Sequence, residues 1–238
     1  STDSCYLVYM GSAQQTVTAP SGSIVSGQIA NAELELPNNL KVIDSSNLIF
    51  GTGSDAKIFH DGNNTKFQHT GTGGLYVGAD TFAITNGATD TNHISIDSNG
   101  HVTMPLQSAF LVQPSSAQSN LAISTNHVVV FDTERFDQNG DFSSNTFTAP
   151  VTGRYQFNVQ LYLQHLDTDT SYYQPQLNTS NRTYYFIVST NNHDADADYY
   201  TLNFVILTDM DANDTVNVTF PVIGGGSAQT DINTESAF

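Results

Sequence analysis

The chain has very little cysteine, little positive charge and no long apolar run. Its 238 residues include one cysteine, Cys5, so no internal disulfide can form. Six Lys and Arg stand against 23 Asp and Glu, for a formal net charge of −17. Binding to nucleic acid or to an anionic membrane needs clustered basic residues, so we expect neither partner. No apolar run reaches the length of a membrane span, and we expect no membrane insertion.

The sequence also lacks the motifs of common enzyme chemistry. It has no Gly-x-Ser-x-Gly, no His-Glu-x-x-His, no phosphate-binding loop and no Rossmann glycine set. The two converging carboxylates of a glycosidase are not visible in a sequence, because it does not show which acids meet. We therefore expect no catalytic residues and a binding protein rather than an enzyme, with a glycan hydrolase as one alternative.

The composition that remains is typical of an all-β protein. Hydrophobic residues make up 38% of the chain, 17 glycines provide turns, and Asn, Thr and Ser are abundant. The distribution of apolar and turn-forming residues along the chain predicts three zones. Residues 1–38 are an irregular linker with a short helix around Gln28–Glu33, residues 39–105 are a repetitive β shaft, and residues 106–238 are a β-sandwich head.

Short apolar clusters separated by Gly and Asn turns define the predicted shaft. Each cluster offers one to three apolar side chains, too few to close a core in one chain. We therefore expect three chains to share a core about one axis, in a homotrimer; a monomeric β domain with glycine-rich hairpins is the alternative. The clusters are Leu48–Phe50, Ile58-Phe59, Phe67, Leu75–Val77, Phe82 with Ile84, Ile94 with Ile96, and Val102 with Met104.

Residues 147–157 are the most informative stretch of the predicted head. Pro150 and Gly153 mark a turn, and alternating apolar residues follow it at Tyr155, Phe157 and Val159. This pattern predicts a half-buried strand. Because residues two apart share a face, Tyr155 and Phe157 are expected to point into the sandwich or into a subunit interface.

The string Phe-Thr-Ala-Pro-Val-x-Gly-x-Tyr-x-Phe resembles the signature of the complement globular-head family, which shares the tumour-necrosis-factor jelly roll. The resemblance implies a jelly-roll head whose last strand begins at 235–238 and is missing beyond Phe238. Further matches follow in order: Ala109-Phe110, Val128–Asp132, Gly140–Phe142, Leu207–Asp209, Asp214–Val216 and Glu235–Phe238.

The shaft zone resembles the shafts of bacteriophage tail fibres at 55–64, 73–77 and 94–102. This implies an extracellular virion protein, a viral tail fibre whose trimeric head attaches the virion to a glycan or protein of the host surface. A missing N-terminal part would join other tail proteins. The alternatives are a secreted or cell-surface complement-head-like module that binds carbohydrate or protein, and a head that acts mainly as a trimerisation clamp.

An acidic run at 191–198 supplies the candidate metal ligands Asp194, Asp196 and Asp198. In an extended chain these carboxylates point to one side, so calcium is the candidate ion. The run mimics the start of an EF-hand loop but has Tyr199 and Val205 where that loop needs Gly and Glu. A solvated acidic loop is the alternative.

Three tyrosine pairs lie in the predicted head, and strand geometry points one member of each pair outward. An outward tyrosine beside carboxylates suits a receptor site, because it offers a flat apolar face next to polar groups. The alternative is that all six tyrosines are packed. The receptor-binding candidates, drawn from loops 165–174, 178–185 and 191–200, are His165, Asp167, Asp169, Tyr172, Tyr173, Tyr184, Tyr185 and Tyr199.

Overall fold

The computed structural model describes residues 44–225 and 229–238. The chain divides into two compact units, 1–78 and 79–238. Cys5, the predicted linker 1–38 and its short helix lie outside the described residues. The only helical element in the described part is the 3-10 turn η1, Thr190–Asn192, so the prediction of an all-β protein is confirmed there. None of the described helices could cross a membrane.

The first unit contains a three-stranded antiparallel sheet in the order β1-β2-β3, formed by Asn47–Phe50, Ala56–His60 and Thr65–His69. The turn between β2 and β3 is held by Asp61, whose Oδ1 accepts hydrogen bonds from the N–H groups of Asn63 and Asn64 at 3.0 and 2.7 Å. A side-chain bond from Lys66, followed by these backbone bonds, holds the pKa of Asp61 well below its usual range.

The second unit begins with a similar small sheet, β4-β5-β6, formed by Phe82–Thr85, Asn92–Ile96 and Val102–Thr103. Asp97 holds the turn between β5 and β6 by accepting the N–H groups of Asn99 and His101 at 2.8 and 2.9 Å. The predicted strand at Leu75–Val77 is wrong: these residues lie in no strand, and Tyr76 is 92% exposed. Gly73, Gly74 and Gly78 flank the cluster and disfavour a strand there.

Neither small sheet has a core of its own. No residue in the described stretch 44–107 is buried. Eight apolar side chains of these strands are instead between 38% and 61% exposed, and Phe59, Ile94 and Ile96 are half-buried. The eight are Leu48, Ile49, Phe50, Ile58, Phe67, Phe82, Ile84 and Val102. The sequence expectation that one chain cannot cover these strands therefore agrees with their exposure in the single chain.

Residues 106–238 form a β-sandwich. The first sheet is built around β18, Thr215–Ile223. The second has the order β17-β12-β19, formed by Ala197–Met210, Gly153–Leu166 and Asp231–Ile232. A separate pair is formed by β7, Phe110–Gln113, and β9, Thr133–Asp137. The other strands of the first sheet are β8 Asn126–Val128, β10 Phe142–Ser143, β11 Thr146–Thr148, β13 Tyr172–Tyr173, β14 Gln176–Thr179, β15 Thr183–Tyr185 and β16 Val188–Ser189.

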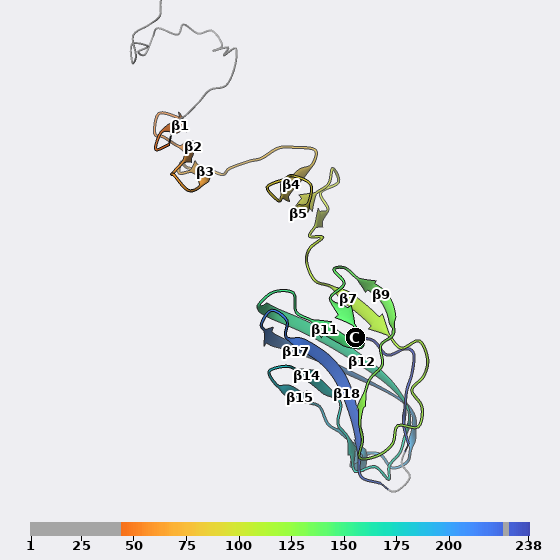
Figure 1. The fold of residues 1–238 in the computed structure, drawn as a ribbon. Coiled ribbons are helices and arrows are strands. Elements are labelled where there is room, and N and C mark those ends of the chain that lie inside the picture. The colour runs from red at the N-terminus through yellow and green to blue at the C-terminus, as the bar shows by residue number, and fades with distance from the viewer. Residues whose placement is uncertain (1–43, 226–228) are drawn as a thin grey trace, which may run out of the picture. The chain divides into compact units, whose positions relative to one another are not determined.

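Figure 1 shows the strands of both sheets. The buried side chains of the core lie between the sheets and follow the alternation expected from the sequence. On β12, Phe157 is 4% exposed, and its ring centroid lies 5.5 Å from that of Phe147 on β11 of the facing sheet. Tyr155 is half-buried, and its hydroxyl donates to the carbonyl of Val151 at 2.6 Å. The expectation that these two residues face the interior is confirmed, and the arrangement of the sheets is consistent with a jelly roll.

The outer face of the β12–β17 pair carries no charged side chain along most of its length. The continuous antiparallel pairing of β12 with β17 places the outward residues of the two strands opposite one another. The charged residues Arg154 and Asp209 lie opposite each other at one end of the pair. Towards the end of this face that adjoins Arg154 and Asp209, Val205 and Leu207 are 58% and 65% exposed. We call it the uncharged face; it consists of Gln156, Asn158, Gln160, Tyr162, Gln164, Tyr199, Thr201, Asn203, Val205 and Leu207.

Candidate functional site

A cleft of about 270 Å³ lies where β12 ends and β17 begins. The two strands are antiparallel and Leu166 pairs with Ala197, so residues just beyond the end of one strand lie beside residues just before the other. Two loops that the sequence suggested separately, 165–174 and 191–200, are thereby brought together. The lining residues are His165, Leu166, Asp167, Asp196, Ala197, Asp198 and Gln229. We call this site the acidic cleft.

Hydrogen bonds join the two loops of the acidic cleft. Asp196 accepts the backbone N–H of Thr168 at 2.9 Å and its hydroxyl at 2.7 Å. These bonds, the backbone one first, lower the pKa of Asp196. The N–H of Asp167 donates to the hydroxyl of Tyr173 at 2.8 Å, which ties the loop to the core. The carboxylate of Asp196 is therefore held by fixed partners on the other loop.

His165 lies at the mouth of the acidic cleft. Its φ of +56° breaks the regular course of β12, and its side chain is 67% exposed. The ring nitrogen Nδ1 lies 3.1 Å from Oδ2 of Asp231, which is at the start of β19. Nε2 has no partner among the described side-chain contacts, so the ring offers one polar edge to a ligand.

Burial divides the tyrosine pairs as strand geometry predicts. Tyr173 is fully buried and stacks on Phe220 with ring centroids 5.7 Å apart, so its proposed contact with a receptor is wrong. Tyr172 is half-buried in β13, and Asp169 is exposed. Tyr199 is 64% exposed and stacks on Tyr162 at 6.1 Å, so it belongs to the uncharged face rather than to the acidic cleft.

Tyr184 and Tyr185 lie at the other end of β17, which separates them from the acidic cleft. The hydroxyl of Tyr184 donates to Oγ1 of Thr208 at 2.9 Å, and Tyr185 is 62% exposed. Asp198 and Asp209 are eleven positions apart on one strand, or roughly 35 Å. The loop 178–185 is thus not part of one recognition surface with the other two loops, because an extended strand separates them.

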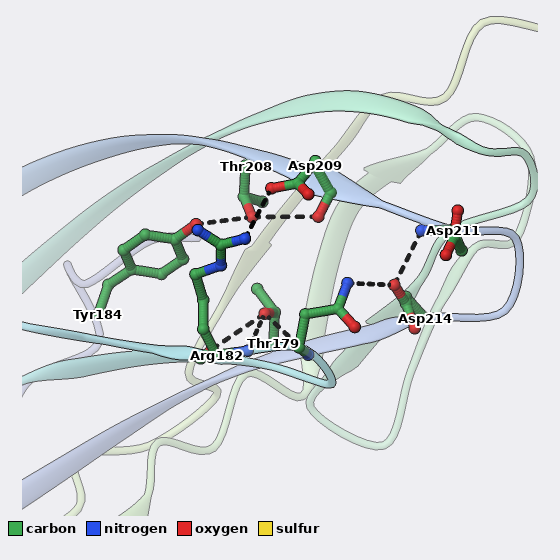
Figure 2. A network of polar contacts seen from close by, with 8 residues as sticks. Thr179, Arg182, Tyr184, Thr208, Asp209, Asp211 and Asp214 are labelled. Carbon is green, nitrogen blue, oxygen red and sulfur yellow. Dashed lines mark hydrogen bonds and ion pairs between the residues drawn. The ribbon is translucent and has the colours of Figure 1, made fainter.

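This opposite end holds a polar network that the sequence reasoning missed (Figure 2). Arg182 Nη2 lies 3.3 Å from Asp209 Oδ1, and Asp214 accepts the N–H of Asp211 at 2.8 Å. Arg154 lines a second cleft of about 250 Å³ beside Asp209. The available signal was the scarcity of basic residues, since a rare arginine in an acidic chain is expected to lie near a carboxylate.

The candidate calcium ligands do not form a metal site. Asp194 and Asp198 are exposed, and Asp196 is already bonded to Thr168. Among residues 44–225 and 229–238, no three His, Cys, Asp or Glu side chains come together as a metal site requires. The three carboxylates were expected to point to one side of an extended chain. That expectation does not apply here, because only Asp198 of the three lies in a strand.

The chemistry of the acidic cleft suits a ligand rich in hydrogen-bond donors. Three Asp residues, one Gln and one His line it, and no Lys or Arg does. Carboxylates accept strong hydrogen bonds from hydroxyl and amino groups and repel phosphate or sulfate. A neutral sugar or a cationic group therefore fits the cleft better than an anionic one.

Several fixed aspartates make the stability of the head depend on pH. Side-chain and then backbone bonds from Ser115 lower the pKa of Asp132, and a backbone bond from Asp211 lowers that of Asp214. A lowered folded pKa contributes stability above the unfolded value of about 3.9, and this is lost as the pH falls through the folded value. We expect the urea concentration at the unfolding midpoint to decrease when the pH drops below about 4. This decrease should be smaller for the Asp132→Asn variant than for the parent.

The Asp132→Asn comparison is needed because protonation also relieves repulsion within a chain of net charge −17. That relief acts on parent and variant almost equally, so the difference between their pH profiles isolates the Ser115–Asp132 bonds. Two parallel profiles between pH 7 and pH 3 would show that these bonds contribute nothing.

No protein-family model and no curated protein matches the chain. Among solved structures, the globular domain of zebrafish complement 1qA is 15% identical and covers 56% of this chain and 96% of its own, with a TM-score of 0.38. Murine APRIL is 16% identical, covers 53% and 98%, and has a TM-score of 0.35. A CBM35 from Cellvibrio japonicus Abf62 is 16% identical, covers 54% and 90%, and has a TM-score of 0.26. At these identities and TM-scores the likenesses assign neither a family nor a function.

Proposed function

We propose that the chain is part of a homotrimeric viral tail fibre, in which a β shaft carries a β-sandwich head that attaches the virion to the host cell surface. The observation that carries this proposal is the absence of any buried residue in the described stretch 44–107, although its strands present apolar side chains in succession. Exposed apolar strands are unfavourable in water, and three chains about one axis would cover them.

The uncharged face of the head supports the same assembly. Copies that each carry a net charge of −17 repel one another, so a surface without charge favours their close association. Val205 and Leu207 add exposed apolar area to this face, and the Gln and Asn side chains beside them can pair across an interface. The face therefore fits a second copy of the same chain.

The acidic cleft is the proposed receptor site because of its place on the head. Residues 106–108 lie beside Gly153 and Arg154, at the start of β12, where together they line a common cleft. The acidic cleft is at the other end of β12. Loops at the end of a sandwich that is remote from its attachment can vary without disturbing the core. The proposed ligand is a hydroxyl-rich glycan or a protein group of the host surface, bound without catalysis.

Removing the acidic charges should abolish attachment without unfolding the head. The Asp167→Asn/Asp196→Asn/Asp198→Asn variant changes all three aspartates that line the cleft. It keeps an oxygen that can accept from Thr168, so we expect normal folding and assembly. Hydrogen bonds to charged acceptors contribute about 1.5–3 kcal/mol each, so binding of the fluorescent chain to host cells should fall by about tenfold or more. Flow cytometry over a panel of bacterial strains measures this.

The matched control removes three charges elsewhere, at Asp80, Glu134 and Asp209. Because these residues lie away from the acidic cleft, the control should bind cells as the parent does. If the cleft variant binds like the parent, with and without chelator, the cleft is only solvated surface and the head serves mainly as a clamp. Immunogold labelling of phage particles that encode the chain separates a tail fibre from a secreted binding module.

A further inference from the structure

The small sheet β1-β2-β3 has two faces of different chemistry, because successive side chains of a strand point to opposite faces. The register aligns Leu48 with Ile58, and Ile58 with Phe67, so each strand contributes one side chain to an apolar row across the sheet. The three side chains are 38%, 39% and 53% exposed. The face that carries this row has no Lys, Arg, Asp or Glu among the strand residues. Its other residues are Phe50, Ala56, His60, Thr65 and His69.

On the opposite face of the same sheet, each apolar side chain has a lysine beside it. Ile49 is aligned with Lys57, and Phe59 is aligned with Lys66. The ammonium nitrogen of Lys66 lies 5.8 Å from the centre of the Phe59 ring, and Phe59 is half-buried. A lysine covers apolar neighbours with its alkyl stem while its charge stays in water. The opposite face therefore suits contact with water, whereas the apolar row has no such cover.

The sheet β4-β5-β6 has the same arrangement with a different sequence. Phe82 is aligned with Ile96, and Ile96 with Val102, which gives a second apolar row with one side chain from each strand. Phe82 and Val102 are 41% and 61% exposed. The opposite face carries Ser95 and Thr103, whose hydroxyl oxygens lie 3.4 Å apart. Each of the two small sheets thus has one face with an apolar row and one face with polar groups.

A second copy of this chain fits the apolar rows better than an unrelated partner does. Copies that run parallel and in register bring each row beside the same row of the neighbouring copy, at both sheets at once. An unrelated partner would need apolar rows of its own at matching places along its chain. The face that carries Leu48, Ile58 and Phe67 also has no fixed charge, which favours contact between copies of net charge −17.

We propose that the apolar row of each small sheet packs against the same row of two other copies around a threefold axis, while the opposite face meets water. This inference rests on the trimer proposed above and adds which face of each sheet is buried in it. Three side chains from each of three copies close a small core that a single copy cannot form. Leu48, Ile58 and Phe67 build the core at the first sheet, and the row that contains Ile96 builds the core at the second.

Single cysteines at neighbouring positions test this proposal, in a chain whose own cysteine is removed by Cys5→Ser. Ile58→Cys lies in the apolar row, and Phe59→Cys lies on the opposite face of the same strand. In a single chain Ile58 is 39% exposed and Phe59 is half-buried, so Ile58→Cys would react with a maleimide at least as fast as Phe59→Cys. In the proposed trimer this order reverses, and we expect Ile58→Cys to react about tenfold more slowly than Phe59→Cys. Val102→Cys and Thr103→Cys form the matched pair in the second sheet, with Val102→Cys the slower.

Light scattering on the same samples separates this inference from the trimer itself. A trimer in which Ile58→Cys and Val102→Cys react as fast as their matched controls would overturn the inference and leave a trimer that is held together by its heads. Slow reaction of Phe59→Cys beside fast reaction of Ile58→Cys would mean that the opposite face is buried, which overturns the inference as well. Protection in one sheet alone would overturn it for the other sheet. A folded single chain would contradict both the inference and the trimer.

Discussion

The Phe157→Ala variant is expected to lower the free energy of unfolding of the head by about 3–5 kcal/mol, through lost burial and a residual cavity. Phe157 is 4% exposed, and its ring lies 5.5 Å from Phe147 and 5.7 Å from Phe238. These two neighbours come from separate parts of the chain and cannot both move to fill the space. Urea denaturation followed by tyrosine fluorescence measures the change.

Phe136→Ala is the matched control, because Phe136 lies on β9 and is 51% exposed. Truncating an exposed side chain away from the core usually changes stability by about 0.5 kcal/mol or less, and slightly more where the ring borders a groove. If Phe157→Ala and Phe136→Ala have the same midpoint, Phe157 does not contribute to the core as its burial indicates.

The second large effect is expected in the assembly. Light scattering of the parent chain should give three times 25.7 kDa, because three chains are proposed to share the shaft core and the uncharged face. Val205→Asp/Leu207→Asp adds two negative charges to each copy of that face. Like charges brought into one interface repel strongly, so the variant should separate into single chains of 25.7 kDa.

Both substituted side chains point outward, so circular dichroism of the variant should keep the strand signal of the head. Val151→Asp is the control, since Val151 is 63% exposed but lies in the turn before β12. It should remain a trimer. A parent that is folded and monomeric would contradict the shared shaft core. A Val205→Asp/Leu207→Asp variant that stays trimeric would mean that the shaft core or another face of the head holds the three chains together.

Features that depend on neighbouring residues in the chain could be predicted from the sequence. The turn at Pro150–Gly153 and the strand after it were read correctly, because alternation along one strand is a local property. By the same alternation, one tyrosine of each pair faces the core of the sandwich and the other points away from it. Tyr173, Tyr184 and Tyr200 pack on the core, whereas their partners are more exposed or lie outside it.

Which tyrosine of a pair faces the core could not be predicted from neighbouring residues in the chain. Tyr173 rather than Tyr172 faces the core because β13 pairs with Val222 and Ile223 of β18, and that register sets its inward face. The failed strand at Leu75–Val77 has a similar cause. Its residues are apolar, but a strand forms only where another strand is available to pair with it.

The sequence by itself determined an all-β chain, most strands of the stretch 44–105, the strand that follows Gly153, and the acidity of the loops. Only the tertiary structure decided which loops form one site. Antiparallel pairing of β12 with β17 brings Asp167 to Asp196, and the same pairing puts Tyr184 at the far end of the head. Contacts between residues distant in the chain depend on how strands pair, and that pairing cannot be predicted from local composition.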